Sequence, residues 1–152
     1  MFRGINTVNL DQKGRMALPS RYRARISDAS SGQMVVTIDT EETCLLLYPS
    51  TEWESIEKKL QALPSFNRAA RRIQRLLIGH ATDVELDGQG RLLLPSLLRE
   101  YAALEKKVVL IGQGNKFELW SERNWQLGRD AWLATKALNG MELPPEMEDL
   151  AL

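Results

Sequence analysis

Short apolar segments alternate with turn-forming residues from the start of the chain. The segment INTVNLD (5–11) alternates imperfectly and predicts a strand. Asp11–Gly14 is typical of a turn, because aspartate accepts backbone N–H bonds and glycine reaches positive φ without a steric penalty. RMAL (15–18) resumes a strand, and Pro19, with its fixed φ, suits the first turn of a helix in SRYRARI (20–26). The first 26 residues therefore predict strand, turn, strand and helix.

The same pattern occurs twice. LDQKGRMALPSRYR occupies residues 10–23, and LDGQGRLLLPSLLR occupies residues 86–99. The likeness continues downstream, where MVVTI (34–38) corresponds to VVLIG (108–112). CLLLYPSTEW likewise corresponds to KFELWSERNW (116–125). Each copy therefore predicts short strands, one small helix, and a last strand that leads through a turn into a tryptophan-bearing helix.

Two local signals predict how those last helices begin. Thr51 with Glu54 fits a capping box, and Ser121 can cap the helix of the second copy. Cys44, beside LLLY in an expected strand, is interpreted as a buried core thiol.

The repeat predicts an α+β fold. A unit of about 45 residues buries little apolar surface alone, so two units should pack together as one pseudo-two-fold, β-barrel-like domain. We expect a first module over 1–53, a helical linker over 54–79, a second module over 80–125, and a helix with an acidic tail over 126–152.

The linker and the tail differ in charge. In NRAARRIQRLLIG, Arg68, Arg71, Arg72 and Arg75 fall on one helical face, with Gly79 expected as the C-cap. This face (the Arg68–Arg75 face) can contact DNA backbone or anionic partners, or pair with Glu54 and Glu57 or with a neighbouring subunit. An exposed, solvated or ion-paired face is the commoner fate of such a stripe. The tail is acidic and proline-bearing, which indicates loose or partner-dependent attachment; its acidic residues are Glu142, Glu146, Glu148 and Asp149.

Composition narrows the class of protein. The chain has 152 residues, 43% hydrophobic and 26% charged, and no apolar run near the roughly 20 residues of a membrane helix. MFRG is not followed by the apolar stretch of a signal peptide, and the single Cys44 suits a reducing compartment. With one cysteine and one histidine (His80, expected as a cap or packing residue), the chain assembles no Cys/His zinc site, and neither metal nor cofactor is expected.

These motifs together resemble the MraZ family of bacterial transcriptional regulators. The resemblance runs from MFRG through both L-D-x-x-G-R-x-x-x-P-S copies, CLLLYP, RRIQRLLIGHA and NKFELW, and fades after about residue 125. It implies two AbrB-like swapped-hairpin modules, a homo-oligomeric ring, and DNA binding in the promoter of the division and cell wall gene cluster. The family's Asp-x-x-x-Arg signature falls on Asp11 with Arg15 and on Asp87 with Arg91.

The distribution of charge distinguishes the two copies. The net charge is zero, yet residues 1–27 carry six basic side chains against Asp11 alone, whereas residues 77–103 carry two against four acidic ones. Because phosphate attraction supplies the sequence-independent part of DNA affinity, the first copy is expected to bind DNA.

The expected contacts centre on the first turn. Gly14 lets the backbone approach DNA, Arg15 can bind guanine with two hydrogen bonds, and Lys13 and Arg3 would meet phosphate. Alternatively, Arg15 only forms an ion pair with Asp11 across the turn. Both interpretations are compatible if Asp11 orients the Arg15 side chain. Weaker candidates, which can add to the positive field, are Arg91, Arg21 and Arg23.

Two other classes of protein fit the sequence less well. An enzyme is not expected, because no nucleophile–base pair, phosphate-binding glycine loop or metal cluster is present. An antitoxin-like protein-interaction module of the same superfamily remains the alternative. Such a protein would wrap a toxin with a long hydrophobic-acidic C-terminus, whereas the tail here is acidic but short. The favoured interpretation is a cytoplasmic, nucleoid-associated repressor that binds repeated promoter sites as an oligomer.

Overall fold

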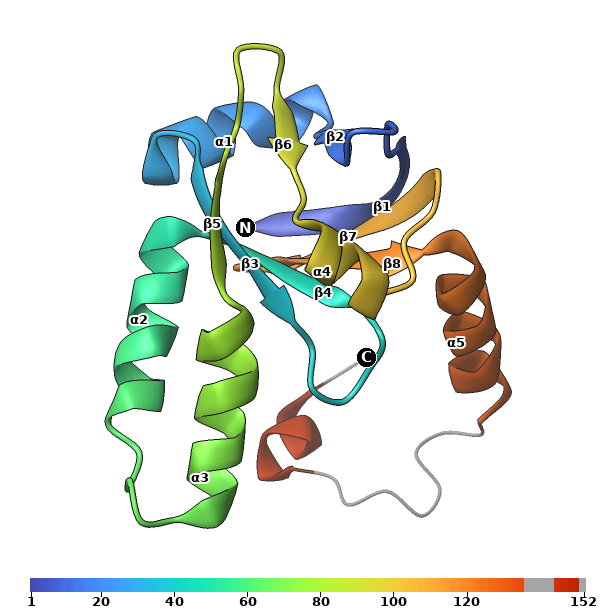
Figure 1. Cartoon of the computed structure of the whole chain (residues 1–152). Coiled ribbons are helices and arrows are strands. Elements are labelled where there is room, and N and C mark those ends of the chain that lie inside the picture. The colour runs from blue at the N-terminus through green and yellow to red at the C-terminus, as the bar shows by residue number, and fades with distance from the viewer. Residues whose placement is uncertain (136–143, 151–152) are drawn as a thin grey trace.

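The computed structural model describes residues 1–135 and 144–150, which form the α+β fold expected from the repeat (Figure 1). In chain order the elements are β1 (Phe2–Asn9), β2 (Arg15–Ala17), α1 (Ser20–Ser30), β3 (Gln33–Ile38), β4 (Leu45–Pro49), α2 (Ser50–Gln61), α3 (Arg68–Ile73), the π-helix η1 (Gln74–Ile78), β5 (Thr82–Glu85), β6 (Arg91–Leu93), α4 (Ser96–Tyr101), β7 (Lys107–Gly114), β8 (Phe117–Ser121), α5 (Glu122–Ala134) and the short 3-10 helix η2 (Pro145–Asp149). The strands and helices of the two copies thus match one for one.

The two copies exchange strands instead of folding side by side. The main sheet has the order β1-β7-β8-β4-β3-β5, and β2 pairs with β6 in a second, two-stranded sheet. The first strand of each copy therefore pairs with the third strand of the other, β1 with β7 and β5 with β3, all antiparallel. The order reads the same from either end when the copies are exchanged, which is the expected pseudo-two-fold symmetry. Over the described residues the strands form two sheets and no closed barrel.

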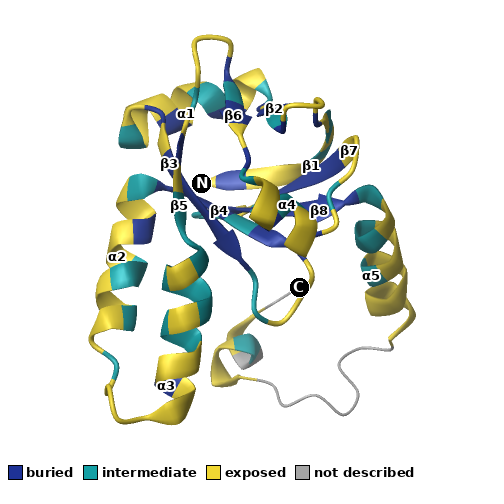
Figure 2. Cartoon of the chain, viewed as in Figure 1, coloured by how far each residue is buried: buried dark blue, intermediate teal, exposed yellow. Residues whose placement is uncertain are grey.

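The core lies between these sheets and is shared by both copies. Met16 and Leu92 of the small sheet are fully buried, as are Ile26 of α1 and Leu98 of α4. Figure 2 shows the buried residues gathered on the central strands, while α2 and α5 are largely exposed. Phe117 from the second copy packs on Phe2 and, edge to face, on Tyr22 from the first, with ring centroids 4.3 and 4.9 Å apart. The largest apolar cluster is thus common to both copies, since each supplies part of it.

The last helix of each copy and the helices of the linker pack on the flanks. In Figure 1, α2 and α3 lie side by side at one end of the molecule, away from β2 and β6. Gln74 Nε2 donates to the Leu60 carbonyl oxygen at 2.7 Å and so joins η1, which continues α3, to α2. On the other flank, Trp125 and Trp132 of α5 pack on Trp120, with ring centroids 6.0 and 5.6 Å from it.

One of three expectations about helix ends is wrong. No Thr51–Glu54 capping box forms, because α2 begins at Ser50 straight after Pro49 and Thr51 lies inside its first turn. Gly79 is the C-cap of η1, as expected, although with right-handed angles (φ −62°, ψ −33°); its N–H donates to the Gln74 carbonyl oxygen. Ser121 does cap α5, since its hydroxyl oxygen accepts the Asn124 N–H at 3.0 Å. The acidic tail is only partly described: Glu142 lies outside the described residues, and Glu146 and Asp149 belong to η2.

Candidate nucleic-acid interface

The first turn is organised by the carboxylate of Asp11. Its Oδ1 accepts the backbone N–H groups of Lys13 and Arg15, each at 2.9 Å, and its Oδ2 accepts Arg15 Nε at 2.8 Å. The backbone N–H of Arg15, together with its guanidinium and the N–H of Lys13, holds the pKa of Asp11 below its usual value. Gly14 has φ +87°, a conformation that favours glycine. Asp11 therefore stays ionised and fixes the direction of the Arg15 side chain.

The second turn repeats this geometry. Asp87 Oδ1 accepts the N–H groups of Gln89 and Arg91 at 2.8 and 2.9 Å, and its Oδ2 accepts Arg91 Nε at 2.9 Å. Gly90 has φ +73°, and the Arg91 backbone N–H is again the chief cause of a lowered pKa of Asp87. The ion pairs expected in both copies are therefore present, and the geometry of the pairs does not distinguish the two turns.

The small sheet brings both arginines to one surface. Arg15 lies opposite Leu93, and Arg91 lies opposite Ala17, in the antiparallel β2/β6 ribbon. These residues face outward, whereas Met16 and Leu92 between them are buried. The two turns lie at opposite ends of the ribbon, because its strands are antiparallel. The ribbon thus presents two carboxylate-held arginines on a single face.

Arg3 is placed elsewhere. It lies near the start of β1, and the first turn follows the end of that strand, about 20 Å away at the rise of an extended chain. Arg3, Arg21 and Arg25 instead gather with Tyr22 around a small hollow of about 160 Å³. Arg21 Nη2 donates to Asn6 Oδ1, and its guanidinium stands 4.7 Å above the Tyr22 ring. These residues form a basic cluster distinct from the turn.

Arg23 lies at the turn of the other copy. Its Nε donates to the Leu18 carbonyl oxygen at 2.8 Å, and its guanidinium packs on Gly90. Arg99 holds the matching place in the second copy, where its Nε donates to the Leu94 carbonyl oxygen at 3.0 Å and its guanidinium packs on Gly14. Sequence reasoning missed Arg99 as a member of the first turn. Its alignment with Arg23 in the repeat was the available signal.

The charge asymmetry at the turns is smaller than the sequence windows suggested. The first turn has Lys13, Arg15 and the adjacent Arg99 beside Asp11. The second turn has Arg91 and the adjacent Arg23 beside Asp87, with Gln89 in place of the lysine. The turns themselves therefore differ by one positive charge, that of Lys13.

The Arg68–Arg75 face is exposed as expected, and it lies at the far end of the molecule from the ribbon (Figure 1). Within residues 1–135 and 144–150, none of its four guanidinium groups is within salt-bridge distance of a carboxylate, so the alternative pairing with Glu54 or Glu57 does not form in this chain.

Cys44 and His80 hold structural positions. Cys44 is fully buried, and its thiol donates to Asp39 Oδ2; burial first, and then Glu118, Asp39 and Glu42, raise the pKa of the thiol. Asp39, Cys44 and Glu118 offer atoms within 4.8 Å of one another. His80 Nδ1 lies 2.7 Å from the Leu76 carbonyl oxygen.

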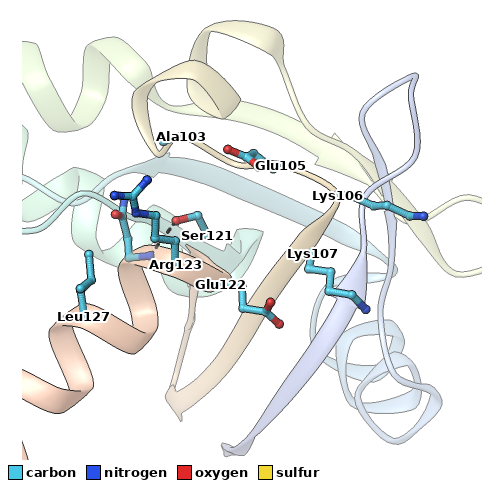
Figure 3. A pocket seen from close by; sticks show the side chains of 9 residues that line it. Ala103, Glu105, Lys106, Lys107, Ser121, Glu122, Arg123 and Leu127 are labelled. Atoms are coloured by element: carbon cyan, nitrogen blue, oxygen red, sulfur yellow. Dashed lines mark hydrogen bonds between the residues drawn. The ribbon is translucent and has the colours of Figure 1, made fainter.

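A hollow of about 580 Å³ lies where the α4–β7 connection meets the start of α5 (Figure 3). None of the predicted DNA-binding residues lines it. The Ser121 hydroxyl oxygen accepts the Asn124 N–H as the cap of α5, and the dashed line in Figure 3 marks this hydrogen bond. Across the described part of the chain, no helix is both long and apolar enough to cross a membrane.

The fold and the paired turns define a chain of two interleaved hairpin–helix modules that share one outward-facing β-ribbon. A family described as "MraZ protein, putative antitoxin-like" matches residues 1–76 and again 77–129. The chain belongs to the MraZ family. Its relatives include proteins named Transcriptional regulator MraZ from Legionella pneumophila (strain Corby), 60% identical, and from Coxiella burnetii (strain Dugway 5J108-111) and Halorhodospira halophila, both 57% identical. Each alignment spans 152 residues and the whole of both chains.

Proposed function

We propose that this chain is a transcriptional regulator that binds double-stranded DNA in a sequence-specific way through the β2/β6 ribbon. The observation that carries the proposal is the outward-facing Arg15, held by Asp11 through both its backbone N–H and its Nε. A two-stranded ribbon fits the DNA major groove, where an arginine can donate two hydrogen bonds to guanine. Because the side chain is already oriented, little conformational entropy remains to be lost on binding.

The residues of the first turn take different roles. Arg15 reads a base through its terminal nitrogens, since its Nε is engaged by Asp11. Lys13 is exposed at the tip of the turn and meets phosphate, which sets position and not sequence. Asp11 acts through Arg15 as a positioning residue. Gly14 keeps the turn compact through its positive φ.

The basic residues outside the first turn make weaker contributions to DNA binding. Arg91 faces the same side as Arg15 and lacks a neighbouring lysine, so its contribution to binding is the weaker one. Arg3 and Arg21 contribute to the positive field from the cluster beside β1. Arg23 contributes at the second turn.

The regulatory role follows from the family and from the names of the relatives. The chain represses the division and cell wall gene cluster that contains its own gene, and it acts in the cytoplasm at the nucleoid. It assembles as a homo-oligomeric ring, so that several turns engage repeated promoter motifs together. One turn makes few phosphate contacts, and simultaneous engagement multiplies modest affinities.

A footprint tests the proposal directly. Full-length protein should protect repeated short motifs immediately upstream of its own gene, and a reporter driven by that DNA should fall when the protein is produced. Random duplex of equal length, titrated at low and moderate salt, gives the non-specific reference. Equal binding to both duplexes would contradict sequence-specific recognition. Failure of the folded protein to bind any duplex would favour the antitoxin-like interaction module instead.

A further inference from the structure

Each turn of the ribbon is packed against an arginine from the opposite module. At Gly14, an added Cβ would lie 2.8 Å from both Cζ and Nε of Arg99. At Gly90, an added Cβ would overlap with Nε and Cζ of Arg23. The glycines are therefore needed for the cross-module contact as well as for their positive φ, and the space beside Gly14 is filled by protein.

Leu94 ties Arg99 to the first turn. Its N–H donates to the Gly14 carbonyl oxygen at 2.8 Å, and its carbonyl oxygen accepts Arg99 Nε at 3.0 Å. Leu18 makes the equivalent link at the other end, to the Gly90 carbonyl oxygen at 3.0 Å and to Arg23 Nε at 2.8 Å. Each guanidinium is thus anchored by one hydrogen bond while its plane covers the glycine of the opposite turn.

The terminal nitrogens of Arg99 make no hydrogen bond to any residue that the structure describes. Arg99 is half-buried, and no carboxylate in the described ranges lies within salt-bridge distance of it. It therefore leaves a full positive charge beside Lys13 and Arg15, although it belongs to a stretch of sequence that is acidic overall.

From these contacts we infer that Arg99 is a positioning residue of the first DNA-binding turn, supplied by the second module. It holds Gly14, and through the turn Arg15, in the conformation that meets DNA, and it adds charge there. Arg23 holds the second turn in the same way. The DNA-binding part of this inference rests on the proposed function; the holding of the turns does not.

Three variants of the full-length protein separate the roles. Arg99→Met removes the planar guanidinium and its charge, Arg99→Lys keeps the charge but loses the Nε–H donor and the planar group, and Arg23→Met makes the matched change at the second turn. Each is titrated with footprinted duplex and with random duplex, beside Arg15→Ala. Backbone amide hydrogen exchange is followed at Gly14 and Gly90, whose N–H groups close the two turns on Asp11 and Asp87.

Arg99→Met should weaken specific binding by roughly tenfold or more, the scale of one lost hydrogen bond to a charged group. Arg99→Lys should weaken specific binding to a similar extent while it keeps binding to random duplex, because its charge remains. Arg23→Met should keep most specific binding. The Gly14 amide should exchange faster in both Arg99 variants, and the Gly90 amide should do so in Arg23→Met.

The outcomes distinguish the inference from the proposed function. Unchanged Gly14 exchange in Arg99→Met would overturn the inference whatever happens to DNA. If Arg99→Lys binds specific duplex as the unmodified chain does, charge alone matters and the positioning role is wrong. If Arg15→Ala loses specific binding but Arg99→Met binds as the unmodified chain does, the positioning role of Arg99 is also wrong, and the proposed function stands. Unchanged binding in Arg15→Ala, with accelerated exchange in Arg99→Met, would overturn the proposed function and leave the holding of the turn standing.

Discussion

Arg15 and Arg91 project from the same face of one antiparallel ribbon, Arg15 opposite Leu93 and Arg91 opposite Ala17. Each is held by a carboxylate four residues earlier, at 2.8 and 2.9 Å. The two arginines can therefore be compared within one chain. Their ion pairs have the same geometry, but only Arg15 has a lysine, Lys13, in its turn.

The first prediction uses that comparison. Arg15→Ala should reduce specific DNA binding by about ten- to a hundredfold per turn, because a bidentate guanine contact discriminates by roughly 1–3 kcal/mol. Arg91→Ala should leave most binding in place. Both variants should stay folded, since exposed ion pairs add little stability. Duplex titrations with melting temperatures check this, and equal damage by both variants would mean that both turns read DNA.

Lys13 should act on affinity without sequence preference. Lys13→Ala should weaken specific and random duplex alike and lower the slope of log affinity against log salt by about 1, the effect of one lost phosphate contact. Gln89→Ala, the same position in the second turn, is the matched control and should change neither. A loss confined to the specific duplex would assign base recognition to Lys13 instead.

Multivalent binding is the third prediction. The protein should bind duplexes with several direct repeats of its motif about a hundredfold more tightly than a single-copy duplex, because linked sites raise the effective concentration. Light scattering at the same concentration should give an oligomer mass. A monomer mass, or affinity independent of copy number, would contradict the proposal.

Gly14 should be intolerant of a side chain. Gly14→Ala should destabilise the fold by about 1–3 kcal/mol, since alanine would have to adopt φ +87° and displace Arg99. Gly88→Ala is the control, because nothing lies within 4 Å of an added Cβ there. Its effect should stay within about 0.5 kcal/mol. Denaturant unfolding measures both, and similar midpoints for the two variants would refute the packing argument.

The ionised state of Asp11 should show in the pH dependence of stability. Because hydrogen bonding lowers the folded pKa of Asp11 below its ordinary 3.8, ionisation favours the folded state. This contribution is present above about pH 4 and is lost as pH falls through the folded pKa. The difference in melting temperature between the unmodified chain and Asp11→Asn should therefore shrink from pH 7 towards pH 2. A difference that does not change with pH would show that charge is not involved.

Much of the site could be predicted from sequence because it is local. The Asp11–Arg15 and Asp87–Arg91 pairs each span four residues and close through backbone hydrogen bonds within the turn. Their geometry depends on aspartate, glycine and spacing, which the sequence displays. The buried Cys44 was likewise predictable, since it stands beside an apolar strand.

Helix ends were less predictable. The Thr51–Glu54 pattern matches a capping box, yet the chain leaves β4 through Pro49 and enters α2 one residue too early for Thr51 to cap it. Gly79 does cap its helix as predicted, but it does so with right-handed angles after a π-helix, which the sequence did not indicate.

The sequence by itself determined the repeat, the order of its elements and the form of its turns, because these depend on interactions between near neighbours. Only the tertiary structure decided that β1 pairs with β7 and β3 with β5, that Arg3 lies far from the turn, and that Arg99 rather than Arg23 covers Gly14. The physical reason is that neither copy can bury its apolar face alone. Exchange of strands buries both faces in one core, and that exchange carries an arginine of each module to the turn of the other.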